Sequence, residues 1–207
     1  MDDRYSTAEP ELSLKAGTNL RFRLLGFLPL IFFLAQAIHY WRINELGHML
    51  WMCNIGNLLL ALGLFLNRPP LIRVAVIWLI PGLVVWFLYV ALAWGLVLSS
   101  TLAHVGGIAV GMVALKKVGM DRVAWLYALG WYLVIQLFSR LFTPVALNVN
   151  VSHTIDPGWQ QTFGAYWQFW VVLTVTTAIL LWLIGIGLHK LWPASPAIVT
   201  PGINNQG

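Results

Sequence analysis

Cys53 and His104 are the side chains of this sequence best suited to do chemistry together, because they occupy similar depths in two separate apolar runs. Counted at 1.5 Å per residue, Cys53 lies about 10 Å and His104 about 12 Å from the same predicted membrane boundary. An imidazole can accept the proton of a thiol, and the thiolate can then attack an acyl carbon. The spacing therefore predicts a nucleophile–base pair.

Both residues also have a structural interpretation. A free cysteine in an apolar run is most often a small buried hydrophobic group. A histidine inside a membrane segment usually marks function, although it can also form a hydrogen bond between helices. The sequence leaves these alternatives open for Cys53 and His104.

Further polar side chains fall in the same half of the apolar runs as this pair. They are Gln36, Asn54, Asn57, Ser99, Ser100, Thr101, Gln136, Arg140 and Thr174. The other halves of three runs, residues 58–66, 105–115 and 178–188, contain no Asn, Gln, His, Ser or Thr. Because a polar group in hydrocarbon is costly unless it is paired, this asymmetry predicts a polar chamber that opens toward one membrane face.

We expect the residues around this chamber to support the catalytic pair or to bind substrate. Those predicted to do so are Asn54, Asn57, Ser100, Thr101, Gln136, Arg140, Asn148 and Asn150. An amide or hydroxyl group could orient the imidazole or stabilise an oxyanion. Arg140, near the end of its run, either reaches the lipid headgroups or binds an anionic group with Asn148 and Asn150.

The composition indicates a membrane protein. Of the 207 residues, 59% are hydrophobic and 9% are charged, whereas charged residues make up about 25% of a soluble domain. Runs near the spanning length of about 20 residues occur at 22–41, 46–66, 71–93, 96–115, 123–143 and 168–191. The sequence therefore predicts an all-α, polytopic fold with six transmembrane helices in residues 22–192. Residues 1–21 form a polar tail, and residues 193–207 are expected to be disordered.

The basic residues predict the orientation. Ten of the twelve Lys and Arg residues lie on one side of the six predicted spans, and only Arg42 and Arg140 lie on the other. The positive-inside rule then places both termini in the cytoplasm, and we expect the chain to reside in a cell membrane, the inner membrane if it is bacterial. Because the basic residues are dispersed over short loops, we expect no binding to nucleic acid.

The sequence predicts membrane lipids as partners and no cofactor. It has no glycine-rich phosphate-binding loop and no clustered metal-ligand motif, so we expect neither a metal ion nor a soluble cofactor. Other membrane proteins, or a second copy of the chain, could also bind.

Four short segments resemble one known family. They are the run from Trp51 to Asn57, the Pro81-Gly82 pair, His104, and Asn148-Val149-Asn150. Together they look like the YwaF-like integral membrane proteins, which are related to a eukaryotic membrane acyltransferase and more remotely to the androgen-induced lipid hydrolases. The resemblance covers most of residues 24–190.

In that group a Cys or Thr nucleophile on an early span is paired with a His on a later span. The resemblance therefore implies these roles for Cys53 and His104. A basic or polar residue often follows the nucleophile in the group, and here it is Asn54, so the role of base rests on His104 alone.

These observations favour a membrane enzyme that transfers or hydrolyses the acyl group of a lipid. The alternative is a non-enzymatic membrane protein, which would be a transporter or receptor for a small solute or lipid, or an assembly subunit of a membrane complex. In that case the polar layer would bind a ligand or join helices by hydrogen bonds.

Overall fold

The computed structural model describes residues 20–92 and 95–194. The predicted tails, residues 1–21 and 193–207, lie almost wholly outside these ranges. Within the described residues all regular elements are helical, and one isolated bridge joins Met120 to Pro193. The predicted all-α class is therefore confirmed for this part of the chain.

In the described residues, α-helical segments are joined by short 3₁₀ and π turns, and the elements below are these helices and turns. In chain order they are α2 (Phe27–Arg42), η2 (Leu46–Leu50), α3 (Met52–Phe65), α4 (Pro69–Ala91), α5 (Leu98–Thr101), η3 (Leu102–Gly106), α6 (Gly107–Val118), α7 (Ala124–Phe142), η4 (Val145–Leu147), η5 (Val149–Val151), η6 (Pro157–Trp159) and α8 (Tyr166–Leu191). The turn η3 is π-helical, and α5, η3 and α6 together form one helix from Leu98 to Val118. The helix that contains α2 likewise begins at Leu20.

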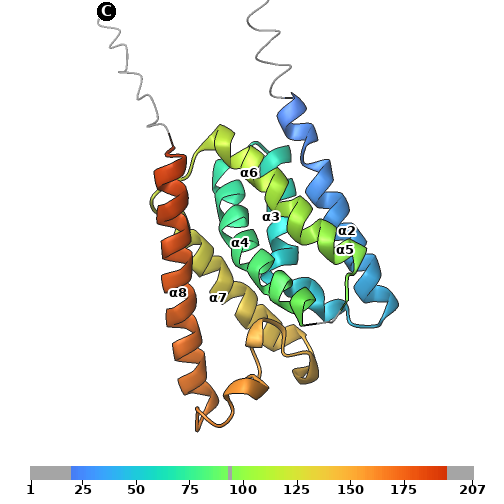
Figure 1. The fold of residues 1–207 in the computed structure, drawn as a ribbon, viewed down its shortest axis with the longest axis vertical. Coiled ribbons are helices and arrows are strands. Elements are labelled where there is room, and N and C mark those ends of the chain that lie inside the picture. The colour runs from blue at the N-terminus through green and yellow to red at the C-terminus, as the bar shows by residue number, and fades with distance from the viewer. Residues whose placement is uncertain (1–19, 93–94, 195–207) are drawn as a thin grey trace, which may run out of the picture.

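Helix α4 is the centre of the bundle, as Figure 1 shows. It packs against α3, α6, α7 and α8. Apart from Arg73 near its start, its first half is apolar on all sides, and every residue from Val74 to Leu79 is buried. A helix that is hydrophobic all round is expected at such a central position, because it has no face to expose.

Four helices are long and apolar enough to cross a membrane. Their bounds are Leu20–Arg42, Pro69–Ala91, Leu98–Val118 and Tyr166–Leu191. Large hydrophobic side chains remain exposed along them, for example Val172 and Ile179 on α8. Exposed apolar surface of this extent fits a lipid environment, so the fold is compatible with a membrane protein.

The other two predicted spans differ from the prediction. The run 46–66 divides into η2 and α3, and the 14 residues of α3 are about 21 Å long, which is less than the apolar thickness of a bilayer. Helix α7 is not among the four apolar helices, because its Trp and Tyr residues together with Gln136, Ser139 and Arg140 lower its mean hydropathy. The six-span topology stays a prediction.

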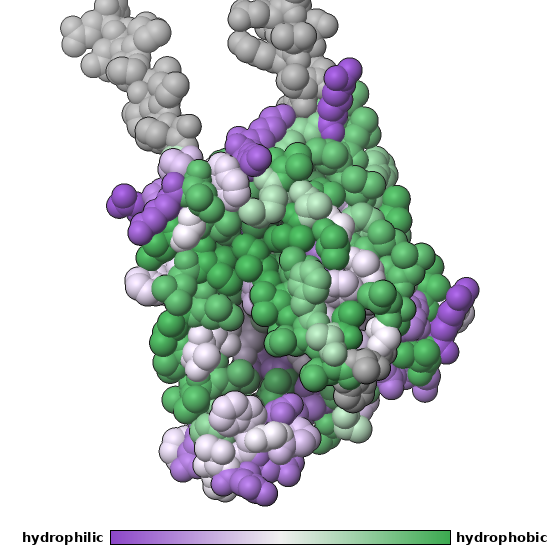
Figure 2. Space-filling view, viewed as in Figure 1, coloured by the Kyte–Doolittle hydropathy of each residue, from purple (hydrophilic) through white to green (hydrophobic). Residues whose placement is uncertain are grey.

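The surface divides into three zones along the bundle. On the face in Figure 2, a broad hydrophobic band lies between hydrophilic residues at the two ends. The start of α2 and the end of α8 lie at the same end of the bundle (Figure 1). The segment from Val145 to Ala165, which joins α7 to α8, lies at the other end.

Candidate functional site

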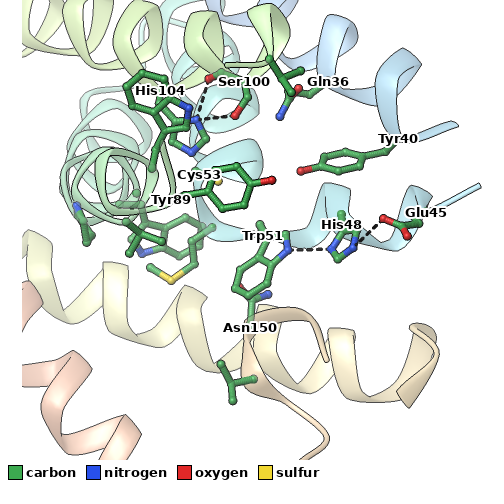
Figure 3. A pocket seen from close by; sticks show the side chains of 18 of the residues that line it. Gln36, Tyr40, Glu45, His48, Trp51, Cys53, Tyr89, Ser100, His104 and Asn150 are labelled. Carbon is green, nitrogen blue, oxygen red and sulfur yellow. Dashed lines mark hydrogen bonds and ion pairs between the residues drawn. The ribbon is translucent and has the colours of Figure 1, made fainter. Parts of the chain in front are cut away.

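A cavity of about 570 Å³ lies in the half of the bundle away from the start of α2 and the end of α8. It is lined by side chains of α2, η2, α3, α4, η3, α7 and α8, and most of them are aromatic or aliphatic (Figure 3). Both Cys53 and His104 line it. Apolar groups dominate the wall of this cavity, whereas the sequence predicted a polar chamber, and whether it opens toward one membrane face stays a prediction.

His104 lies on the π-helical turn η3, and its ring is fixed from two sides. Its Nδ1 lies 2.8 Å from the backbone oxygen of Ser100, one turn earlier. Because a carbonyl oxygen can only accept, Nδ1 carries the proton and Nε2 keeps its lone pair. Trp86 stacks on the ring at 5.9 Å between centroids and 16° between planes. Single π turns often occur at functional sites, and this one holds an imidazole with a free acceptor nitrogen at the cavity.

Cys53 and His104 approach each other across Gly82 of α4. A Cβ atom at position 82 would lie 3.0 Å from the Cys53 Cβ and 3.8 Å from the His104 Cδ2. Glycine at position 82 therefore lets both residues pack close to α4, and a larger residue there would contact the Cys53 Cβ and the His104 ring. No hydrogen bond joins the two side chains among those found in the described residues; in free enzymes such bonds are often long and shorten when substrate binds.

Two tyrosines place hydroxyl groups beside the thiol. In Figure 3 the hydroxyl groups of Tyr40, from α2, and Tyr89, from α4, both point into the cavity in front of Cys53. A phenol hydroxyl can donate a hydrogen bond. These two residues therefore bring hydroxyl groups to the part of the wall near Cys53.

His48 lies near the cavity entrance between two fixed partners. The Trp51 Nε1 donates to His48 Nδ1 at 2.9 Å, and His48 Nε2 lies 3.2 Å from the Glu45 carboxylate. Since an indole N–H is only a donor, Nδ1 is unprotonated, and the imidazole is neutral with its proton on Nε2. Glu45 is thus the charged member of this pair.

Two predicted supporting residues line the cavity together with the pair. The Ser100 Oγ lies 3.5 Å from His104 Nδ1, a longer contact than the one from its own carbonyl oxygen. The Asn150 Nδ2 donates to the backbone oxygen of Leu50 at 2.8 Å and to Ser139 Oγ at 3.0 Å, which ties η5 to η2. Gln36 also lines the cavity; it is 1% exposed, and its Oε1 has no hydrogen-bond partner.

Backbone strain occurs next to Asn150. Asn148, Asn150 and Val151 all have positive φ values, of 39°, 53° and 53°. Asparagine tolerates this conformation, whereas a β-branched residue is a genuine outlier there. The Tyr166 hydroxyl donates to the Val151 backbone oxygen at 3.1 Å and helps to hold it. Val151 lines the cavity, so the strained turn forms part of the wall.

The other predicted supporting residues of α3 and α5 do not line the cavity. The Asn57 Nδ2 donates to the backbone oxygens of Cys53 and Ala103, both at 2.9 Å, and so joins α3 to η3. Asn54 donates to the backbone oxygen of His48 at 2.9 Å, and Thr101 to that of Val97 at 3.1 Å. These contacts position backbone that carries site residues.

The predicted supporting residues of α7 and the following loop also have internal partners. The Gln136 amide donates to the Tyr132 hydroxyl and the Asn150 backbone oxygen and accepts from Trp170 Nε1 at 2.8 Å. Arg140 donates to the backbone oxygen of Ser152 at 2.7 Å, and its guanidinium lies 5.1 Å from the centre of the Tyr166 ring.

Asn148 closes its own loop, since its Oδ1 accepts from the backbone N–H groups of His153 and Thr154. The expected anion clamp of Arg140, Asn148 and Asn150 is therefore not assembled in this structure.

The sequence did not reveal the aromatic part of the site. The cavity is lined by Tyr40, Trp51, Trp86 and Tyr89. The chain has twelve tryptophans and six tyrosines, and the sequence does not distinguish these four from the others. The one available signal was spacing, because Gln36 and Tyr40 are one helical turn apart and share a face.

Several buried polar atoms have no partner, although of their residues only Gln36 lines the cavity. Among the described residues they are Gln36 Oε1, Asn54 Oδ1, Asn57 Oδ1, Ser99 Oγ, Ser152 Oγ and Thr174 Oγ1. Unpaired buried groups are rare and call for an explanation, such as a ligand or water. The described residues contain no group of three or more His, Cys, Asp or Glu side chains placed to hold a metal ion.

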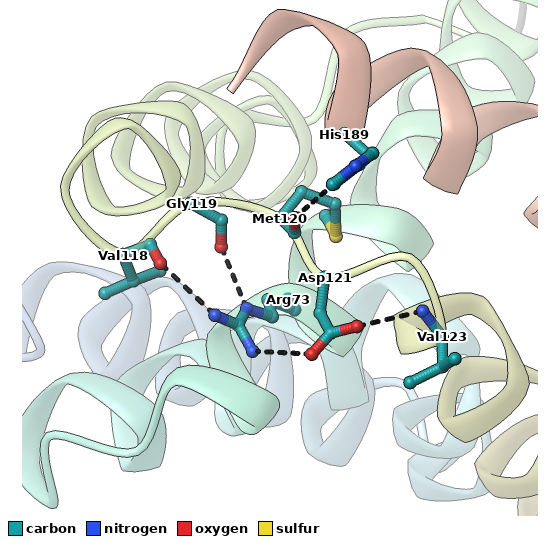
Figure 4. A network of polar contacts seen from close by, with 7 residues as sticks. All are labelled: Arg73, Val118, Gly119, Met120, Asp121, Val123 and His189. Carbon is teal, nitrogen blue, oxygen red and sulfur yellow. Dashed lines mark hydrogen bonds and ion pairs between the residues drawn. The ribbon is translucent and has the colours of Figure 1, made fainter. Parts of the chain in front are cut away.

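The opposite end of the bundle holds a second polar cluster in which the groups are paired (Figure 4). The Arg73 side chain donates to the backbone oxygens of Gly119 and Val118 at 2.8 and 3.2 Å and lies 3.6 Å from the Asp121 carboxylate. His189 Nδ1 lies 2.7 Å from the Met120 backbone oxygen. This Arg73 cluster joins α4, α8 and the loop between α6 and α7.

No family model, curated protein or solved structure matches this chain.

Proposed function

We propose that this chain is an integral membrane enzyme that transfers or hydrolyses an acyl group, with Cys53 as nucleophile and His104 as base. The observation that carries the proposal is the position of both side chains on one cavity, where both lie close to Gly82. An apolar cavity with a few convergent polar groups is typical of a site for a small amphiphilic molecule.

The proposed reaction has two steps. His104 Nε2 takes the Cys53 proton, the thiolate attacks the carbonyl carbon of an ester, and the alcohol leaves with the proton from the imidazolium. A water molecule or a second alcohol then loses its proton to His104 and attacks the thioester, which restores the thiol. The Tyr40 and Tyr89 hydroxyl groups would donate to the oxyanion in each step.

The proposed topology places this cavity near the outer leaflet. Six spans with both termini in the cytoplasm would set the basic end, which includes Arg73, Lys116 and Lys117, on the cytoplasmic side. The packed core between Ile72 and Leu79 would then separate the cavity from the cytoplasm. A cavity that is closed in the inner half of the membrane suits an enzyme whose substrate enters from the lipid better than it suits a transporter.

The single cysteine makes the proposal directly testable. Purified protein in nanodiscs would be incubated with radiolabelled acyl esters and examined for acyl groups that hydroxylamine releases from Cys53. We expect an adduct in the wild type, none in Cys53→Ala, and at least about a hundredfold slower formation in His104→Gln, because general-base catalysis contributes about 10²- to 10⁴-fold.

A matched control is Asp121→Asn, which changes a polar group in the Arg73 cluster at the opposite end of the bundle and should leave the adduct unchanged. Absence of an adduct over a panel of esters, with a thiol that reacts readily with iodoacetamide, would contradict the proposal and favour a binding protein.

A further inference from the structure

We infer that the outer part of this cavity, between Gln36, Tyr40, Trp51 and Glu45, binds the protonated amine of an amphiphilic molecule, an organic ammonium ion with N–H donors. The inference names the substrate class of the proposed enzyme and rests on that function, but the binding itself does not require turnover.

The charge of the lining excludes an anionic group and favours a cation. Glu45 is the one carboxylate among the residues that line the cavity, and neither Lys nor Arg is among them. His48 is neutral because Trp51 donates to its Nδ1, so the Glu45–His48 pair keeps a net charge of −1. Arg140 does not line the cavity and is bound to the Ser152 backbone oxygen.

Aromatic rings form the wall next to this carboxylate. The rings of Tyr40, His48 and Trp51 follow one another, with centroid distances of 5.2 Å and 6.4 Å. The faces of Tyr and Trp rings attract ammonium groups, most strongly where water is excluded. This wall therefore suits a cation and its hydrocarbon chain, whereas a carboxylate or phosphate would meet the carboxylate of Glu45 and find no counter-charge.

A buried acceptor selects an ammonium with N–H groups over a quaternary one. Gln36 lies one turn before Tyr40 on α2 and lines the same cavity, and its Oε1 is buried without a partner. An unpaired buried acceptor is costly until a donor reaches it. A primary ammonium in the cavity could donate to this oxygen once the Gln36 amide group rotates toward it, whereas a quaternary ammonium has no N–H to donate.

The test compares four probes that share a six-carbon chain, on Cys53→Ala protein in nanodiscs of zwitterionic lipid, with empty nanodiscs subtracted. They are hexylammonium, hexyltrimethylammonium, hexanol and hexanoate, and calorimetry measures their affinity. We expect hexylammonium to bind about tenfold or more tightly than hexanol, and hexanoate to bind most weakly. Gln36→Leu should abolish the preference for the primary over the quaternary ammonium.

Charge-matched variants complete the design. Glu45→Gln should weaken hexylammonium binding about tenfold and leave hexanol unchanged. Asp121→Asn makes the same change of charge in the Arg73 cluster and should alter neither. Equal affinity for hexanol and hexylammonium would overturn the inference. So would an unchanged affinity for hexylammonium in the Glu45→Gln variant, provided that this variant is as thermally stable as the wild type. This binding test uses protein that lacks Cys53, so it does not depend on the proposed reaction. If hexylammonium binds but the wild type forms no thioester, the proposed chemistry is refuted and the inferred binding site is not.

Discussion

The two polar regions of this molecule differ in how completely their groups are paired. In the Arg73 cluster, the guanidinium, Asp121 and His189 each have partners within the chain, and the cluster joins α4 and α8 to the intervening loop. At the cavity, Gln36 Oε1 has none and the His104 Nε2 lone pair is unused. Burial of polar groups with partners serves the fold, whereas burial without partners costs stability and points to a ligand. The contrast separates a structural region from a candidate site without reference to any related protein.

The largest expected effect lies in the Arg73 cluster. Arg73→Met removes two hydrogen bonds to backbone oxygens and the ion pair with Asp121, so we expect a loss of about 3 kcal/mol in the free energy of unfolding. Reversible unfolding in mixed micelles would measure it. Arg42→Met, near the opposite end, is the matched control and should change stability little. A loss below about 1 kcal/mol for Arg73→Met would show that the cluster is not structural.

A pair of glutamines gives the most direct comparison of paired and unpaired amides. Gln136→Leu leaves Trp170 Nε1 and Tyr132 without their partner, and we expect it to cost about 2 kcal/mol. Gln36→Leu replaces an amide whose oxygen is unpaired, so its cost should be near zero. Both would be measured by thermal unfolding in the same detergent. Equal losses would remove the distinction between the two regions.

Two glycines sharpen the view of the cavity. Gly82→Ala would put a methyl group 3.0 Å from the Cys53 Cβ, so we expect alkylation of Cys53 by iodoacetamide to slow about tenfold and stability to fall by about 1 kcal/mol. No atom lies within 4 Å of the corresponding Cβ at Gly130. Gly130→Ala should therefore leave the alkylation rate unchanged and raise the stability of the helix slightly. Unchanged alkylation in Gly82→Ala would mean that the thiol is reached from another side.

The smallest expected effect concerns Ser100. Its backbone oxygen, at 2.8 Å, fixes the His104 tautomer, whereas its hydroxyl lies 3.5 Å from the same nitrogen. Ser100→Ala should therefore change the rate of acyl-adduct formation, or of Cys53 alkylation, by less than about twofold. A larger change would assign the hydroxyl a role in orienting the imidazole.

Sequence reasoning predicted the helical class and the half of the bundle that holds the polar groups, because both depend on hydropathy and on helical rise. It also predicted similar depths for Cys53 and His104, and in the structure both residues line one cavity. It could not decide which polar side chains face that cavity. Asn57 and Ser100 both fall in the predicted polar half of their spans, yet Asn57 bonds backbone oxygens and Ser100 lines the wall.

Other features depend on contacts between distant segments. The role of Gly82 is set by the side chains of α3 and η3 that meet there, and nothing in its neighbours along the chain shows this. The shortness of α3 follows from the turn η2, which is pinned by Asn150, one hundred residues later. Such long-range contacts leave no periodic signal in the sequence.

The wide turn η3 has a consequence for how one helix can serve two surfaces. A π turn holds one residue more than a regular turn and so rotates everything after it by about 100° relative to what precedes it. The His104 side chain can therefore face the cavity while Gly107 and Gly111, further along the same helix, pack against Asn57 and Val76 of neighbouring helices. Deleting a single amino acid from this turn would restore a uniform phase, and then either the imidazole or the glycine seam would be turned away from its partners.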